Sequence, residues 1–282
     1  MKMKKYVPEF LIIALLAVVS ICGILSLDFS KSSSYINQYG DMVLIFGSGI
    51  YKADSYFKAP IFIGTDFAVL FFLVPLFVFF LMREIKSQNH KSSLHLISVE
   101  SVSLYYAACL CFGVKYNRIF VLYVALFALL LFSLIARLRT YGKFKIAYEM
   151  KKSDCAFLIF SGISLCIAWW PDIIPTLISG GSLKLIENYT TESTYVLDLG
   201  IISPLCFVSL YLMGKKDSLG TVIYSILLQS IIVVAVMMIT QSTLQFLSGL
   251  NLPLAALISK SAIFVVLGLI AIFLNKRLYK DL

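Results

Sequence analysis

Eight apolar stretches, each about the length of a membrane crossing, constrain this chain more than any other feature. They cover residues 7–27, 60–82, 94–114, 119–136, 155–170, 195–213, 219–240 and 257–274. A membrane helix needs about 20 mainly apolar residues, and its backbone groups are satisfied within the helix. The chain is 60% hydrophobic and 14% charged, whereas soluble domains have roughly 45–50% and 25%. The pattern predicts an all-α integral membrane protein of about eight transmembrane helices.

Basic residues lie mostly on one side of these stretches. With the N-terminus inside, the inner segments hold 17 Lys and Arg and the outer segments hold 6. This asymmetry predicts that both termini are cytoplasmic. The net charge of +9 then belongs to cytoplasmic loops, and the scarcity of aromatic residues among the basic segments argues against nucleic-acid binding. We expect the first apolar stretch to remain as an uncleaved helix, because no small-residue cleavage site follows it.

The two long outer loops, 28–59 and 171–194, share an internal pattern. Each contains an apolar run, 42–46 or 173–178, that is followed by glycines. Because glycine commonly ends a helix with a positive φ, we expect a short helix in each loop, lying at the outer interface or dipping into the bundle.

Polar residues recur at similar spacing in the two halves of the chain. The pairs are Asp41 and Asp172, Lys52 and Lys184, Asp66 and Asp198, Pro75 and Pro204, and Glu100 and Gln229, with offsets of 129 to 132 residues. Because each half has four crossings, such a duplication would give both halves the same orientation. The sequence therefore predicts two parallel four-helix repeats, 1–139 and 154–282, joined by a basic cytoplasmic linker at 140–153.

Asp66 and Asp198 are the foremost candidate site residues. Each lies near the outer end of an apolar stretch, where a carboxylate is costly and faces protein or a wet cavity rather than lipid. In a pseudo-symmetric pair of repeats the two carboxylates could approach one another and bind a cation or relay protons. The alternative is local pairing, of Asp66 with Lys58 or a loop amide and of Asp198 with Arg118 or Lys260.

Four further residues extend this candidate path. Asp54 and Asp172 stand in the outer loops, where they could line a polar vestibule or lie on a solvated surface. Glu100 and Gln229 lie within apolar stretches, where they could continue the path inward or join neighbouring helices by hydrogen bonds.

Several short stretches resemble an uncharacterised family of bacterial polytopic inner-membrane proteins. They are residues 105–113, 117–136 and 194–204, together with Asp54-Ser55 and Gly64-Thr65-Asp66. The resemblance implies a bacterial inner-membrane location. It implies no activity and supplies no catalytic residues.

We therefore expect a permease-like transporter of a small solute or ion. One alternative is an enzyme at the outer leaflet that uses Asp54, Asp66, Asp172 and Asp198 as acid and base groups. Another is a non-catalytic subunit whose outer loops bind a partner protein. We expect the protein to contact the lipid bilayer and to bind a small solute or a proton. No cofactor is predicted, because the chain lacks a phosphate-cradling loop and the common hydrolase motifs.

Overall fold

The computed structural model describes residues 3–141, 148–183, 185–250 and 254–282. Its helices are α1 (Val7–Ile24), α2 (Ala59–Ala68), α3 (Val74–Ser87), α4 (His90–Gly113), α5 (Phe120–Tyr141), α6 (Lys152–Ser179), α7 (Ser193–Leu197), α8 (Ser203–Gly214), α9 (Ser218–Leu247) and α10 (Leu254–Asp281). Single π-helical turns, Val69–Leu73 and Asp198–Ile202, join α2 to α3 and α7 to α8. Within the described residues, eight helical segments are long and apolar enough to cross a membrane, so the predicted all-α multi-span fold is confirmed.

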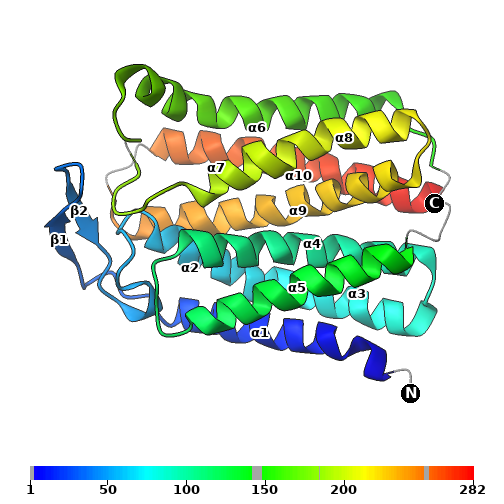
Figure 1. Cartoon of the computed structure of the whole chain (residues 1–282), viewed down its shortest axis with the longest axis horizontal. Coiled ribbons are helices and arrows are strands. Elements are labelled where there is room, and N and C mark those ends of the chain that lie inside the picture. Colours follow the sequence, from blue (N-terminus) through cyan, green and yellow to red (C-terminus); the bar gives the residue numbers. More distant parts are fainter. Residues whose placement is uncertain (1–2, 142–147, 184, 251–253) are drawn as a thin grey trace.

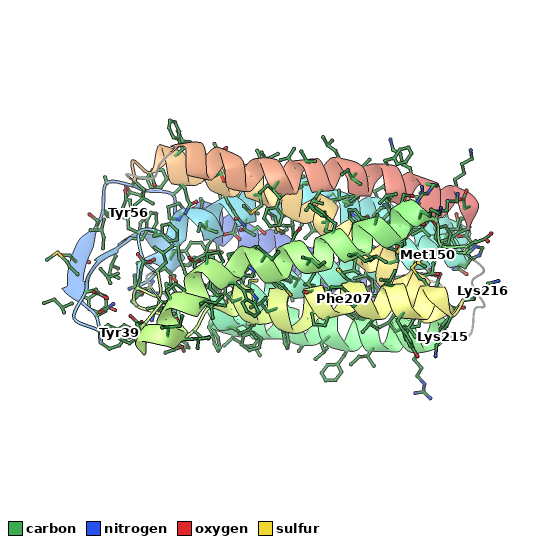
Figure 2. All side chains as sticks on the ribbon, turned by 90° about the horizontal axis from the view of Figure 1, so that it is seen from above. Tyr39, Tyr56, Met150, Phe207, Lys215 and Lys216 are labelled. Carbon is green, nitrogen blue, oxygen red and sulfur yellow. The ribbon has the colours of Figure 1, made fainter. Side chains whose placement is uncertain are left out.

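The helices run side by side, and both termini lie at the same end of the bundle (Figure 1). We call this the terminal end. The opposite end, which we call the hairpin end, carries an antiparallel pair of strands, β1 (Ser33–Ile36) and β2 (Met42–Ile45). Seen from above, Tyr39 and Tyr56 lie at the hairpin end, whereas Lys215 and Lys216 lie at the terminal end (Figure 2).

Helices α4 and α9 form the centre of the bundle. Each is two-thirds buried over its most apolar window, more than any other described crossing, and they pack on one another. One core cluster contains residues of helices α1 through α5 and of the half of α9 nearer the hairpin end. A second contains residues of α6, α8, α9 and α10 and of the start of α4. The two clusters therefore meet along α4 and α9.

The two π-helical turns have the same relation to a proline. One ends at Leu73 and is followed by Pro75, and the other ends at Ile202 and is followed by Pro204. Proline lacks the backbone N–H and its ring crowds the carbonyl four residues before it. The turn preceding each proline therefore widens, and each of these two crossings consists of two shorter helices.

Neither apolar run of the two long loops forms a separate short helix, although a short 3-10 helix, Gly49–Tyr51, follows the first run. Residues 42–45 form strand β2 instead, because they pair with β1 in register from Ile36 with Met42 to Ser33 with Ile45. Residues 173–178 continue α6, which runs through Pro171 and Pro175 to Ser179. Gly180 then ends this helix with φ 69°. A glycine therefore ends a helix where one was expected, but that helix is the long helix α6 rather than a short helix within the loop. The proposed linker at 140–153 lies partly outside the described residues.

Candidate functional site

Asp66 lies fully buried inside the bundle. It is the eighth residue of α2, so it lies about two turns from the hairpin end of that helix. The Tyr51 hydroxyl donates to Oδ2 at 2.6 Å, and the Tyr106 hydroxyl donates to Oδ1 at 2.5 Å. Among the described residues, neither Lys58 nor a loop amide holds this carboxylate. Two tyrosine hydroxyls, one from the hairpin-end segment and one from α4, hold it instead.

Gly23 of α1 makes room for this carboxylate. A Cβ at this position would lie 1.7 Å from Asp66 Oδ2 and 3.1 Å from the Tyr51 hydroxyl. Such distances are far inside van der Waals contact, so a side chain at residue 23 and the present position of Asp66 exclude one another. The carboxylate thus lies in a close-fitting compartment formed by α1, α2, α4 and Tyr51.

Asp198 has a related environment on a different face of α4. It is the first residue of the second π-helical turn and only 7% exposed. The Tyr105 hydroxyl donates to Oδ1 at 2.9 Å, and the Trp169 indole donates to Oδ2 at 3.1 Å. Consecutive residues of an α-helix project about 100° apart, so Tyr105 and Tyr106 direct their hydroxyls to two different carboxylates. Asp66 and Asp198 are therefore both hydrogen-bonded to α4, through consecutive residues.

Asp172 is connected to this second carboxylate through aromatic residues. It is exposed and lies within α6 rather than in a loop. The Tyr195 hydroxyl donates to Asp172 Oδ2 at 2.7 Å, and the Tyr195 ring stacks on Trp169 with 4.5 Å between centroids. Asp172 therefore positions the aromatic pair that in turn contacts Asp198.

Asp54 belongs to a compact cap at the hairpin end. It is fully buried, and its Oδ1 accepts hydrogen bonds from the Tyr189 hydroxyl at 2.8 Å and the Lys115 amide at 2.9 Å. Its Oδ2 has no hydrogen-bond partner among the described residues. Burial raises the pKa of this carboxyl to about 7. Asp54 is enclosed by the segments that carry Tyr189 and Lys115, so its side chain lies neither in an open vestibule nor on a solvated surface.

Tyr189 is the centre of this cap. The Lys58 and Lys115 ammonium groups lie over its ring, 4.2 Å and 5.0 Å from the centroid. Lys58 also pairs with Glu192, and Lys115 donates to the Asn188 carbonyl. The cap thus joins the segment before α2 to the segment before α7, on the hairpin side of Asp66.

Glu100 forms a second charged cluster nearer the terminal end. Its Oε1 accepts from Arg137 Nε at 3.1 Å, while Arg137 Nη2 pairs with Glu9. Both glutamates are buried, and within the described part of the chain the second oxygen of each has no hydrogen-bond partner. Our sequence reasoning selected Glu100 but not Glu9 or Arg137. The sequence feature that could have identified this cluster was Glu9, the only acidic residue of the first apolar stretch.

Gln229 lies buried on α9, one turn beyond Ser225. The Ser225 hydroxyl is 2.9 Å from that of Ser98 on α4 and 2.7 Å from that of Tyr279 on α10. Ser225 therefore joins α9 to α4 and α10 by hydrogen bonds.

Several polar side chains of α4 lie between these groups along the helix. Ser98, Glu100, Ser103, Tyr105 and Tyr106 follow one another from the serine pair with α9 to the two aspartates. No cluster of three His, Cys, Asp or Glu that could hold a metal ion occurs among the described residues.

No family model, no curated protein and no solved structure matches this chain.

Proposed function

We propose that this chain is a permease-like transporter of a small solute or ion, with Asp66 and Asp198 as its binding carboxylates. The observation that carries the proposal is the arrangement around α4. Two carboxylates, each on a helix interrupted by a π-helical turn and a proline, accept hydrogen bonds from consecutive tyrosines of one central helix. Interrupted membrane helices are common at transporter binding sites, and π-helical turns are common at functional sites.

We further propose that the protein lies in a bacterial inner membrane with its terminal end in the cytoplasm. The resemblance noted in the sequence supports the location. The excess of Lys and Arg in the inner segments supports the orientation, since both termini lie at one end of the bundle (Figure 1). The hairpin and the Tyr189 cap would then face outward.

An internal repeat would explain why these two crossings each carry a π-helical turn before a proline. Pro75 and Pro204, and the π-helical turns before them, share one offset of 129 residues. The central helices α4 and α9 occupy equivalent places in the proposed repeats, α1–α5 and α6–α10. A two-fold axis along the membrane normal would then pass between α4 and α9, as in parallel-repeat transporters.

Transport would require the enclosed carboxylates to become accessible in turn from each side. In the structure Tyr51 covers Asp66 from the hairpin end, and the Tyr189 cap joins the segments that lead into α2 and α7. Movement of these segments would open a route from outside. Movement of α4 against Arg137 and α9 would open a route from the cytoplasm. The tyrosine hydroxyls would meanwhile stabilise a carboxylate that has released its proton or cation.

Cysteine accessibility tests this proposal without knowledge of the substrate. Ala107 is fully buried next to Tyr106, and Ala271 is fully buried on α10, away from the proposed path. We expect Ala107→Cys to react with a charged, membrane-impermeant thiol reagent from both membrane sides, in a background that lacks the six native cysteines. Ala271→Cys is the matched control. Equal, slow labelling of both positions from either side would refute a transport path along α4.

The exposed face of the hairpin favours a second candidate function, that of a membrane subunit which binds a partner protein. Ile36, Met42 and Leu44 are 69%, 78% and 42% exposed on this face. Reconstitution of the chain alone in lipid vesicles distinguishes the two functions. A transporter shows reagent access at Ala107→Cys without any other protein, whereas a subunit of this kind stays closed until its partner is added.

A further inference from the structure

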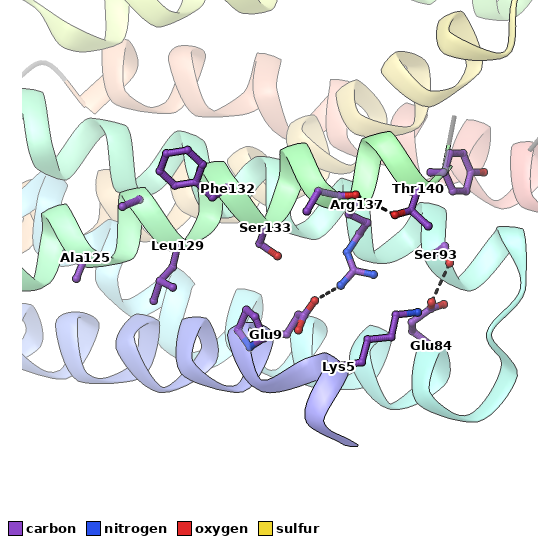
Figure 3. A pocket seen from close by; sticks show the side chains of 14 residues that line it. Lys5, Glu9, Glu84, Ser93, Ala125, Leu129, Phe132, Ser133, Arg137 and Thr140 are labelled. Carbon is purple, nitrogen blue, oxygen red and sulfur yellow. Dashed lines mark hydrogen bonds and ion pairs between the residues drawn. The ribbon is translucent and has the colours of Figure 1, made fainter. Parts of the chain in front are cut away.

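A groove at the terminal end runs between α1 and α5. It has a volume of about 640 Å³, within the range of about 300 to 1,000 Å³ of small-molecule sites. One end is apolar, formed by Ala125, Ala128, Leu129 and Phe132, which recur along one face of α5. The other end carries Glu9, Arg137 and Ser133 (Figure 3). The groove therefore suits a molecule with an alkyl chain and a polar head.

The charges around the polar end do not balance. The groove is lined by Lys5, Arg137, Glu9 and Glu84, and Glu100 lies directly behind Arg137. With every group ionised, three carboxylates face two cations, which leaves one negative charge. Arg137 is shared by Glu9 and Glu100, and Glu84 accepts hydrogen bonds from Ser92 and Ser93. One further positive group would complete this arrangement.

A buried oxygen marks where such a group could bind. Glu9 is 4% exposed, and its Oε2 has no hydrogen-bond partner among the described residues, although the residue lines the groove. An unpaired carboxylate oxygen in a buried site costs free energy unless a donor reaches it. A primary ammonium group supplies both the missing charge and the missing hydrogen. A quaternary ammonium supplies the charge but no hydrogen, and an anionic head without an ammonium supplies neither.

We propose that this groove binds the primary ammonium head of an amphiphile, with Glu9 as the ligand of the ammonium and the apolar face of α5 as the seat of an alkyl chain. Phosphatidylethanolamine is a membrane lipid whose head ends in such an ammonium, and its phosphate would lie toward Lys5, which also lines the groove. This inference goes beyond the proposed transport function and does not depend on it, because it concerns the lipid-facing seam of α1 and α5 rather than the carboxylates beside Tyr105 and Tyr106.

Tryptophan quenching by brominated lipids tests the proposal. Phe132 lines the groove and is 67% exposed, so Phe132→Trp places a reporter there. Phe273→Trp on α10 is the matched control, since Phe273 is 66% exposed, lies at a similar distance from its helix end and is not among the groove residues. Each variant is placed in phosphatidylcholine vesicles that contain an equal mole fraction of chain-brominated phosphatidylethanolamine, phosphatidylglycerol or phosphatidylcholine. The emission of the parent protein, from Trp169 and Trp170, is subtracted.

We expect brominated phosphatidylethanolamine to associate with the Phe132→Trp reporter about fivefold more strongly than the other two lipids, which corresponds to about 1 kcal/mol. The Phe273→Trp reporter should show no preference. In the Phe132→Trp background, Glu9→Gln should remove the preference, whereas Asp217→Asn, which neutralises an exposed acid at the same end, should keep it. Ala128→Leu, which narrows the apolar end without changing a charge, should lower association with all three lipids.

Three results would overturn the proposal. The first is an equal response of the Phe132→Trp reporter to all three lipids. The second is a preference for phosphatidylglycerol, which would identify an anion site built on Lys5 and Arg137. The third is a phosphatidylethanolamine preference that survives Glu9→Gln. The first two outcomes need no variant beyond the reporter, so the test stands even if Glu9→Gln fails to fold. All three leave the accessibility of Ala107→Cys unaffected, so this proposal and the transport proposal fail separately.

Discussion

The contact between Gly23 and Asp66 predicts that Gly23→Ala is strongly destabilising. The new methyl carbon would lie 1.7 Å from Asp66 Oδ2 and 2.5 Å from its Cγ. Asp66 is fully buried and cannot move aside without losing the hydroxyls of Tyr51 and Tyr106. Either the helices separate or the carboxylate leaves its two donors.

The magnitude follows from three contributions. Overpacking of a well-filled site costs about 1 to 3 kcal/mol. Loss of one hydrogen bond to a charged group costs about 1.5 to 3 kcal/mol. The replacement of glycine by alanine in a helix returns about 0.5 to 1 kcal/mol. We therefore expect the free energy of unfolding to fall by about 2 to 5 kcal/mol, which corresponds to a fall in Tm of about 5 °C or more.

The measurement is the temperature at which half of the protein is lost from the monodisperse peak in size-exclusion chromatography after heating in detergent. Gly200→Ala is the matched control, because Gly200 also lies in a helical turn beside a buried aspartate and a Cβ there meets nothing within 4 Å. Gly200→Ala should leave Tm unchanged or slightly raised. A double-mutant cycle with Asp66→Ala isolates the contact, since Gly23→Ala should cost little once the carboxylate is gone. An equal loss in both backgrounds would refute the reasoning.

Three other tests examine the remaining charged and polar contacts by the same measurement. Burial raises the pKa of Asp54 to about 7, above its unfolded value of about 3.9, so the folded state binds the extra proton and loses stability as pH rises between these values. Asp54→Asn should therefore flatten the fall of Tm between pH 5 and pH 8, and a parallel fall in variant and parent would contradict this assignment. Arg137→Met should cost about 3 to 5 kcal/mol because it leaves Glu9 and Glu100 buried without a cation, whereas Arg277→Met should cost less because Asp154 keeps donors from Tyr148, Tyr224 and the Lys151 amide. Tyr106→Phe should lower Tm more than Tyr105→Phe, because Asp66 is more deeply buried than Asp198, and the reverse order would contradict the assigned partners.

The membrane fold could be predicted because its dominant signal is local. Long apolar runs between charged segments identify each crossing without reference to the others. The hairpin was missed because a four-residue apolar run such as 42–45 has no periodicity that separates a strand from a helix turn. The end of α6 was misplaced at Pro171, which normally ends a helix in water. Membrane helices tolerate proline, since neighbouring groups satisfy the freed carbonyl.

The candidate site could be predicted only in part. A carboxylate in an apolar run is conspicuous, which is why Asp66, Asp198 and Glu100 could be selected. The tyrosine partners of these carboxylates could not be selected, because tyrosine occurs in packed helices and at membrane interfaces as well as at functional sites. Tyr106 is 40 residues from Asp66 and Tyr105 is 93 residues from Asp198. Arg137 was interpreted as a topology signal because it adjoins a basic segment, and only the approach of α1 to α5 brings Glu9 to it.

The position of α4 links the Asp66 site to the cluster of Arg137, Glu9 and Glu100. Glu100 and Tyr106 are six residues apart, which is about 9 Å along a helix, whereas the hydrocarbon layer is about 30 Å thick. The ion pair with Arg137 and the hydrogen bond to Asp66 therefore lie within about a third of the layer thickness of one another, on one helix that packs against both α5 and α9. A displacement of α4 large enough to separate Tyr106 from Asp66 must also strain the contact of Glu100 with Arg137. Because both contacts are buried, breaking either one alone is costly. We therefore expect the two to break and form together, so that release at Asp66 is accompanied by a change at the Arg137 cluster.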